Sequence, residues 1–261
     1  MHLNKEVKIH PTAIVEKGAE LGLGIEIGPY ALIGPKVKLG DGVRVYSHAV
    51  VSGRTTIGAR TTIWPFASVG AIPQDLKYRG EDAALVCGED NLFREYANVS
   101  IGTDGGGGTT SIGSGNLFMM NTHVAHDCKI GNRCIIANGS SLAGHIEVDD
   151  NVVIGGLVGV HQFVKIGTFA MLAAGSMVSQ DVPPFVMVNG NRARPTGLNR
   201  TGMERAAFNK EAMAHVKSVY KMIYHSALSL DEVKEALTKQ SVPEAKLFLS
   251  FLQRSSRGIC R

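Results

Sequence analysis

Hydrophobic residues recur at every sixth position along two long stretches of the chain. The first stretch has an aliphatic residue at eleven of eleven such positions from Ile9 to Val69, and the second has an aliphatic residue or Phe at twelve of twelve from Ile112 to Val178. A composition of 44% hydrophobic residues would fill only about 10 of these 23 positions by chance. A fixed period marks a repeat architecture, and six residues match neither the helical period of 3.6 nor a heptad.

The hexads predict a solenoid of short parallel strands. The residue after the hydrophobic position is often Gly, which allows a sharp corner, and the fifth position is often small or β-branched. Three hexads would close one triangular coil, with the repeated hydrophobic side chain on the axis. We therefore expect a mainly β protein, built as a parallel β-helix of hexapeptide repeats in which each coil contacts only its neighbours.

The length of the coil predicts which residues become neighbours in space. Residues three hexads apart, at i and i+18, should lie on adjacent coils, about 4.8 Å apart. This spacing pairs His126 with Gly144, and Asp127 with His145. One patch on the outer wall should therefore contain His126, Asp127, Gly144, His145, His161 and Gln162.

The repeat also predicts the division of the chain. We assign residues 1–190 to the β-helix, with an excursion from the wall near 71–86 and a flexible, Gly-rich solvent loop near 102–111. The repeat should end at Pro183 and Pro184, and an irregular link should follow over 185–198. Residues 191–261 should form a C-terminal α-helical domain of two to four helices, with a capping box at Ser229 and Glu232 and Pro243 in a first helical turn.

Charge and cysteine content restrict the possible partners. Residues 192–261 hold 13 Lys and Arg against 6 Asp and Glu, whereas residues 1–191 hold 14 against 17. A solvated helix surface and a docking site for an acidic partner explain this basic region equally well, and no nucleic-acid-binding motif accompanies it. The four Cys form no C-x-x-C pair, so we expect reduced, buried thiols. The N-terminal MHLNKEVKIHP lacks an apolar leader, and we expect a cytoplasmic protein without membrane insertion.

Four of the nine histidines should cluster by the coil spacing, namely His123, His126, His145 and His161. In one interpretation His126 is a general base beside Asp127, and the backbone N–H of Gly144 stabilises an oxyanion, which would suit acyl transfer. In a second interpretation, three histidines from neighbouring coils or subunits bind Zn²⁺. In a third, they are surface residues without a role. The inward position of Cys128 argues against a Cys–His nucleophile.

Five segments combine into a more specific pattern. They are NTHVAHDCKIGNRCIIANGSSLAGH, VGVHQF, QDLKYRGE, QDVPPF and NGNRARPTGLNRTG. Together they resemble the UDP-N-acetylglucosamine O-acyltransferase family, which performs the first step of lipid A biosynthesis in Gram-negative bacteria. The resemblance extends over essentially the whole chain, and it implies that the predicted β-helix is left-handed.

The resemblance further implies a homotrimer with active sites between adjacent subunits. Such an enzyme transfers an (R)-3-hydroxyacyl group from acyl carrier protein to the glucosamine 3-hydroxyl of UDP-N-acetylglucosamine, without a cofactor or a metal. By matching position, His126 is implied to be the general base, Asp127 its orienting group and Gly144 the oxyanion donor. Substrate contacts are implied for Gln74, Asp75, Lys77, His123, His145, His161, Gln162, Asn199 and Arg205, and a chain-length ruler for Ala174. The acidic carrier protein would account for the basic C-terminal region.

Some residues depart from the family pattern, and other functions remain open. Arg192, Thr201 and Ala206 differ in the region expected to contact the nucleoside, and Ala174 replaces a Gly of some members, which should shorten the preferred acyl chain. An N-acyltransferase acting on a 3-amino UDP-sugar would use the same base. A zinc-dependent, carbonic anhydrase-like trimer does not suit the QDLKY segment or the helical end. A non-enzymatic assembly module would need outward Thr ladders rather than His, Gln and Asp.

Overall fold

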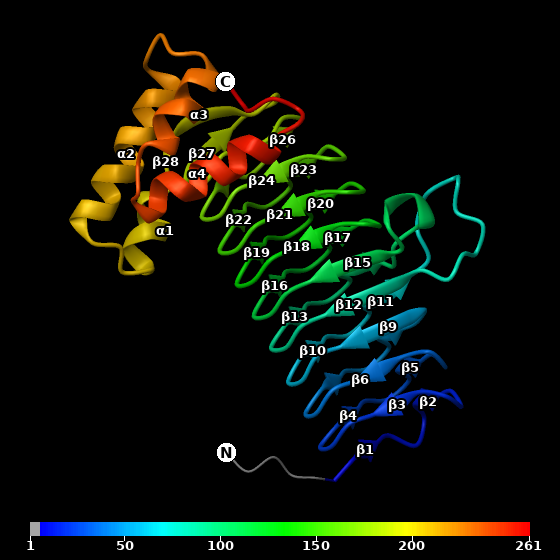
Figure 1. Ribbon diagram of the computed structural model, residues 1–261. Coiled ribbons are helices and arrows are strands. Elements are labelled where there is room, and N and C mark those ends of the chain that lie inside the picture. The colour runs from blue at the N-terminus through cyan, green and yellow to red at the C-terminus, as the bar shows by residue number, and fades with distance from the viewer. Residues whose placement is uncertain (1–5) are drawn as a thin grey trace.

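The protein is described by a computed structural model over residues 6–261, in which a parallel β-helix carries four helices at its C-terminal end (Figure 1). The predicted sequence of coils and C-terminal helices is confirmed. Residues 1–5, which open both the predicted first domain and the segment without an apolar leader, lie outside the described residues. No helix among residues 6–261 has the length and hydropathy needed to cross a lipid bilayer.

Three sheets form the walls of the β-helix in the described chain. Sheet 1 runs in the order β1 (Lys8–Ile9), β4 (Glu26–Ile27), β7 (Arg44–Val45), β10 (Thr62–Ile63), β13 (Leu92–Phe93), β16 (Leu117–Phe118), β19 (Ile135–Ile136), β22 (Val153–Ile154), β25 (Met171–Leu172), β27 (Val186–Asn189) and β28 (Arg194–Leu198). Sheet 2 contains β2 (Ile14–Val15), β5 (Leu32–Ile33), β8 (Val50–Val51), β11 (Ser68–Ala71), β14 (Asn98–Ser100), β17 (His123–Val124), β20 (Ser141–Leu142), β23 (Gly159–Val160) and β26 (Met177–Val178). Sheet 3 contains β3 (Glu20–Leu21), β6 (Lys38–Leu39), β9 (Arg54–Ile57), β12 (Ala84–Cys87), β15 (Thr109–Ile112), β18 (Lys129–Ile130), β21 (Glu147–Val148) and β24 (Lys165–Ile166).

The hydrophobic hexad positions form the core, as predicted. From Ile27 to Val178 they are buried on the axis, and Phe93 stacks on Phe118 of the next coil with ring centroids 4.9 Å apart. The first coil differs, because no described coil lies beneath it: Ile9 is 45% exposed there. The four cysteines are buried and unpaired, as expected, and burial raises the pKa of Cys128 to about 12.

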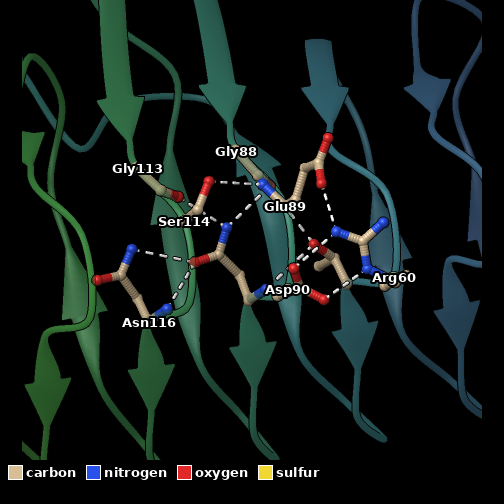
Figure 2. A network of polar contacts seen from close by, with 9 residues as sticks. Arg60, Gly88, Glu89, Asp90, Gly113, Ser114 and Asn116 are labelled. Atoms are coloured by element: carbon tan, nitrogen blue, oxygen red, sulfur yellow. Dashed lines mark hydrogen bonds and ion pairs between the residues drawn. The ribbon is translucent and has the colours of Figure 1, made fainter.

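Buried amide side chains join successive coils at one corner of the β-helix (Figure 2). Asn91 donates hydrogen bonds to the carbonyl oxygens of Gly88 and Gly113 at 2.9 and 2.8 Å. Asn116, on the next coil, donates to the side-chain oxygen of Asn91 at 3.0 Å. These bonds satisfy backbone carbonyls that the corner would otherwise bury without a partner.

Two predictions about irregular segments were wrong. Residues 102–111 are not a loop held in solvent, because Thr103 is buried, a short 3₁₀ helix follows (η1, Asp104–Gly106), and β15 begins at Thr109. Residues 185–198 are not irregular either, since β27 and β28 pair as an antiparallel hairpin that extends sheet 1. The coil continues past the two prolines because β27 pairs with β25 through residues that follow them.

The C-terminal helices are α1 (Arg200–Arg205), α2 (Lys210–Tyr224), α3 (Leu230–Thr238) and α4 (Pro243–Arg254). Ser229 and Glu232 form the predicted capping box of α3, and Pro243 occupies the first turn of α4. Arg254, at the end of α4, bonds to Glu147 at 3.0 Å and also to Asp149. Beyond α4, Ile259 forms a parallel bridge with Asp181, so the chain terminus covers part of the open end of the β-helix.

The inward and outward positions of one strand should differ sharply in their contribution to stability. Leu85 is fully buried on β12, whereas its neighbour Val86 is 45% exposed. We expect Leu85→Ala to lower the free energy of unfolding by about 2–5 kcal/mol, because it leaves a cavity in a close-packed core. Val86→Ala, the matched control, should change it by at most about 0.5 kcal/mol. Urea unfolding measures both, and equal losses would contradict this account of the coil.

Candidate functional site

The clustered histidines lie at the end of β17 and on the two coils that follow it. His123 on β17 pairs with Ser141 on β20, which pairs with Gly159 on β23, so the coil spacing holds at this place. His126, Gly144 and His161 line one cavity of about 630 Å³. Asp127 differs from the prediction, since it is only 4% exposed and does not lie open on the outer wall. Residues of the 102–111 segment cover it.

His126 and Asp127 form a hydrogen-bonded pair. Nδ1 of His126 lies 2.7 Å from Oδ2 of Asp127. Because an ionised carboxylate only accepts hydrogen bonds, the ring proton belongs on Nδ1, which leaves Nε2 with a free lone pair. The ring lies against Gly144, and this places Nε2 in the wall of the cavity.

Thr103 also holds the carboxylate of Asp127, through two hydrogen bonds. The backbone N–H of Thr103 donates to Oδ1 at 2.8 Å, and its hydroxyl donates to Oδ2 at 2.6 Å. The N–H of Asp127 itself donates to the hydroxyl of Thr110 at 2.8 Å. Burial alone would raise the pKa of Asp127, but the hydrogen bonds from Thr103 and His126 outweigh burial and hold this pKa below its usual range. Asp127 is therefore a fixed negative charge behind the imidazole.

Two glycines are required by space around this pair. A Cβ on Gly144 would lie 2.7 Å from Cε1 and 2.9 Å from Nε2 of His126, so only Gly lets the ring pack against the backbone. A Cβ on Gly106 would overlap the carboxyl group of Asp127. Among the described residues, the N–H of Gly144 donates no hydrogen bond, and it remains available to a bound molecule.

His145 stands on the corner directly above Asp127. Its Nδ1 lies 3.8 Å from Oδ2 of Asp127, and its ring stacks on Phe163 with centroids 4.4 Å apart. All three residues adopt positive φ angles between 60° and 67°, a backbone conformation uncommon outside Gly. Burial lowers the pKa of His145, although the charge of Asp127 partly opposes that effect. His145 therefore remains neutral at pH 7.

His123 and His161 complete the row. Nδ1 of His123 lies 2.8 Å from the side-chain oxygen of Asn98, and burial, followed by repulsion from His126, lowers the pKa of His123. Nδ1 of His161 donates to the carbonyl oxygen of Gln162 at 3.1 Å. In both His123 and His161, Nδ1 is therefore hydrogen-bonded within the protein and Nε2 is free to contact a bound molecule.

Two adjoining cavities surround these residues. The lining of the first is Gln74, His123, Ala125, His126, Ser141, Ala143, Gly144, Gly159, Val160, His161, Met177, Val178, Ser179, Asn191 and Arg192. The second, of about 660 Å³, is more highly charged and is lined by Asp75, Lys77, Tyr78, Arg79, Gly80, Glu81, Thr103, Asp104, Gly105, His145 and Phe163. The excursion after β11 contributes to both, with Gln74 in the first cavity and Asp75 and Lys77 in the second.

Four predicted site residues lie elsewhere on the chain. Gln162 is exposed and lines neither cavity, and Ala174 is exposed beyond β25. Asn199 is buried as the N-cap of α1, where it accepts from the N–H of Gly202 and donates to the carbonyl of Phe169, both at 2.9 Å. Arg205 is exposed at the end of α1. None of the four reaches His126 within one chain.

Sequence reasoning missed several residues of the site. Thr103 and Asn98 lie 24 and 25 residues before the groups that they contact, because an insertion lengthens that coil beyond three hexads. Thr103 therefore could not be found from the period. Met177 does obey the period, since it lies three coils above His123, and the coil spacing would have identified it.

The geometry of the same cluster also bears on the alternative of a metal site. Nitrogen and oxygen atoms of His126, Asp127 and His145 lie within 4.8 Å of one another. The 2.7 Å separation of His126 and Asp127 is a hydrogen-bond length, shorter than the roughly 3.3 Å expected between two ligands of a tetrahedral Zn²⁺. Both oxygens of Asp127 also accept from Thr103, so the group is arranged as a hydrogen-bond relay.

Comparison with known proteins gives two family matches. Residues 181–260 match the model of UDP-N-acetylglucosamine O-acyltransferase, domain 2, and residues 109–144 match the bacterial transferase hexapeptide model of six repeats. The second match spans the stretch that contains the His126–Asp127 pair.

Solved structures resemble the chain over its length. LpxA from Acinetobacter baumannii is 42% identical, with 97% of this chain and 99% of that chain covered and a TM-score of 0.94. LpxA, a UDP-N-acetylglucosamine acyltransferase from Bacteroides fragilis, is 34% identical, with 97% and 100% covered and a TM-score of 0.92. The UDP-N-acetylglucosamine acyltransferase of Arabidopsis is 37% identical, with 97% and 100% covered and a TM-score of 0.84.

Removing the hydroxyl that holds Asp127 should destabilise the fold in a pH-dependent manner. In Thr103→Val the lost hydrogen bond to a buried carboxylate should cost about 1.5–3 kcal/mol at pH 7. Because the folded-state pKa of Asp127 is lowered, its ionised form adds stability above the unfolded pKa of about 3.9, and that stability is lost as the pH falls through the folded pKa. The difference from wild type should therefore shrink in acid.

The measurement is urea unfolding of wild type and variant at several pH values. Thr109→Val is the matched control, because the Thr109 hydroxyl makes no hydrogen bond within residues 6–261. An unfolding free energy that Thr103→Val leaves unchanged at pH 7 would show that the hydroxyl does not hold Asp127.

Proposed function

This chain belongs to the UDP-N-acetylglucosamine O-acyltransferase family, and from that premise we propose how its site acts. The acyl donor is an (R)-3-hydroxyacyl thioester of acyl carrier protein, and the acceptor is the glucosamine 3-hydroxyl of UDP-N-acetylglucosamine. The observation that carries the proposal is the His126–Asp127 pair beside the free N–H of Gly144, in the wall of one cavity. The family acts in lipid A biosynthesis.

The proposed chemistry begins with proton removal. Nε2 of His126 takes the proton of the 3-hydroxyl as its oxygen attacks the thioester carbonyl, and Asp127 stabilises the imidazolium that forms. The N–H of Gly144 donates to the oxyanion of the tetrahedral intermediate. When the carbon–sulfur bond breaks, His126 returns the proton to the departing thiolate. The products are the 3-O-acyl sugar nucleotide and the free thiol of the carrier.

The neutral histidines and the excursion bind the substrates in this proposal. The lowered pKa values of His123 and His145 keep both rings uncharged, so that each offers a donor or an acceptor to a sugar hydroxyl without repelling the imidazolium of His126. Gln74 and His161 face the reacting groups from the same cavity, and Asp75 and Lys77 approach from the charged one. The polar sugar and diphosphate groups of the acceptor would bind in this charged cavity.

We propose a homotrimer in which a neighbouring chain supplies the opposite wall. A column of apolar side chains faces outward along sheet 1, each of them exposed or half-buried: Leu92, Leu117, Ile135, Val153, Met171 and Met187. Such a column is a surface that a second copy would cover. Gln162, Asn199 and Arg205, which line neither cavity within one chain, would then act in the site of a neighbour.

The basic C-terminal region is proposed to dock the carrier protein. Arg200, Lys217, Lys221 and His225 surround a small cavity of about 220 Å³ between β28 and α2, and no carboxylate lines it. An acidic carrier would be attracted to this surface, with an association rate that falls as salt is added.

Replacing the base should abolish transfer. His126→Ala should lower kcat by about 10²–10⁴-fold in acyl transfer from (R)-3-hydroxyacyl carrier proteins of several lengths to UDP-N-acetylglucosamine. His10→Ala, at an exposed position on the first coil, is the control. In a parallel arm, a chelator should leave the wild-type rate unchanged. A 3-amino UDP-sugar should be a poorer acceptor than UDP-N-acetylglucosamine. A rate within about tenfold of wild type in His126→Ala would exclude it as the base.

Mixed trimers test whether sites span two chains. His126→Ala and Arg205→Ala should each be inactive alone. Unfolded together and refolded at equal concentrations, they should regain about a quarter of wild-type activity, since a quarter of the interfaces would combine an intact His126 with an intact Arg205 from the neighbour. Separately refolded variants, combined without exchange, are the control. No recovery in the mixture would mean that each site lies within one chain.

A further inference from the structure

His123 is hydrogen-bonded to a residue of the preceding coil. On sheet 2, Asn98 of β14 pairs with His123 of β17. Both backbones are fixed, since the N–H of Asn98 donates to the carbonyl of Thr122 at 2.8 Å and the N–H of His123 donates to that of Ser140 at 2.9 Å. The side chains meet across this strand pair, with Nδ1 of His123 2.8 Å from Oδ1 of Asn98. The contact therefore joins two strands of the wall, not two mobile loops.

This hydrogen bond determines which nitrogen of His123 carries the ring proton. An amide oxygen only accepts hydrogen bonds, so the proton of the neutral ring belongs on Nδ1. His123 lines the same cavity as His126, whereas Asn98 does not line it. Nε2 of His123 therefore offers a lone pair to a bound molecule, and Asn98 acts only through the ring.

The partners of His123 and His126 differ in charge. Nδ1 of His126 lies 2.7 Å from the Asp127 carboxylate, which favours the imidazolium. Asn98 is uncharged, so it fixes the tautomer of His123 without stabilising a positive charge on the ring. Burial, followed by repulsion from His126, lowers the pKa of His123. His123 therefore stays neutral when His126 gains a proton.

We propose that Asn98 is a positioning residue, which holds His123 as a hydrogen-bond acceptor for a hydroxyl of the sugar nucleotide. This role rests on the proposed acyl transfer, and it adds a residue that lies outside the cavity wall. A carboxylate at position 98 would give His123 the kind of partner that His126 has and make it a second base. The neutral amide instead separates the two roles, with proton transfer at His126 and hydroxyl binding at His123.

The experiment compares Asn98→Leu and Asn98→Asp with wild type. Without an acceptor beside Nδ1, His123 in Asn98→Leu should populate both tautomers. NMR of isotope-labelled histidines distinguishes the tautomers, and the His123 signal is assigned by its loss in His123→Ala. In Asn98→Leu the KM for UDP-N-acetylglucosamine should rise about 2–12-fold, the contribution of one hydrogen bond, and kcat should change by less than about twofold.

Asn98→Asp keeps the acceptor and adds a charge. At about pH 8.5, where the ring is neutral, it should retain the Nδ1–H tautomer and a KM within about twofold of wild type. The carboxylate should raise the pKa of His123, so the transfer rate should fall at a higher pH than in wild type on acidification, because protonated His123 has no lone pair. The other titratable groups that line the cavity, His126, His161 and Arg192, are the same in both proteins.

Ser68→Ala is the matched control, because Ser68 pairs with Asn98 one coil lower and its hydroxyl makes no hydrogen bond within residues 6–261. It should leave the tautomer and KM unchanged. An Nε2–H tautomer in wild type, a KM that Asn98→Leu does not raise, or a KM that Asn98→Asp does not restore overturns the inference and leaves the proposed acyl transfer intact. A wild-type chain that transfers no acyl group overturns both.

Discussion

The stacking of each coil on the next through parallel backbone hydrogen bonds is the constraint on which the rest of this structure depends. An axial column of aliphatic side chains requires every coil to present the same position inward, and close packing does not tolerate a shift of that column. The outward positions are then free to vary while their spacing stays fixed. His123, Ser141, Gly159 and Met177 owe their alignment to residues such as Val124 and Leu142, which point the other way.

The His126–Asp127 pair combines this regular spacing with an irregular segment. The coil supplies His126 and Gly144 as neighbours, and the insertion after β14 supplies the Thr103 groups that hold Asp127. A buried carboxylate needs hydrogen bonds to stay ionised, and a regular corner offers too few donors. The interruption of the repeat is therefore the part of the wall that makes a buried negative charge stable beside an imidazole.

The features that depend on the regular repeat could be predicted from the sequence, and those that depend on the irregular segments could not. The period predicted the β-helix, its axial residues and the proximity of His126 to Gly144, because each depends only on counting hexads and sets of three hexads. The contacts of Thr103 and Asn98 could not be predicted from the period, since their coil is longer than three hexads. The hairpin of β27 and β28 was not predicted, because antiparallel pairing after two prolines breaks the hexad pattern. Asn199, Arg205 and Ala174 were implied only by resemblance, whereas the coil spacing also predicted Gln162; none of the four lines the cavity that contains His126.

The register across the two insertions has a consequence for how such a chain can change length. Thr62 pairs with Leu92, and Leu92 pairs with Leu117, so both coils are longer than three hexads, yet the inward column continues without a shift. The extra residues of each coil leave the wall at a corner and return to the same point. Loss or gain of a whole coil would keep every wall in place, whereas loss of a single hexad would turn all later residues onto the next face. Length variation in this family should therefore occur as whole coils, or as excursions of any size at a corner.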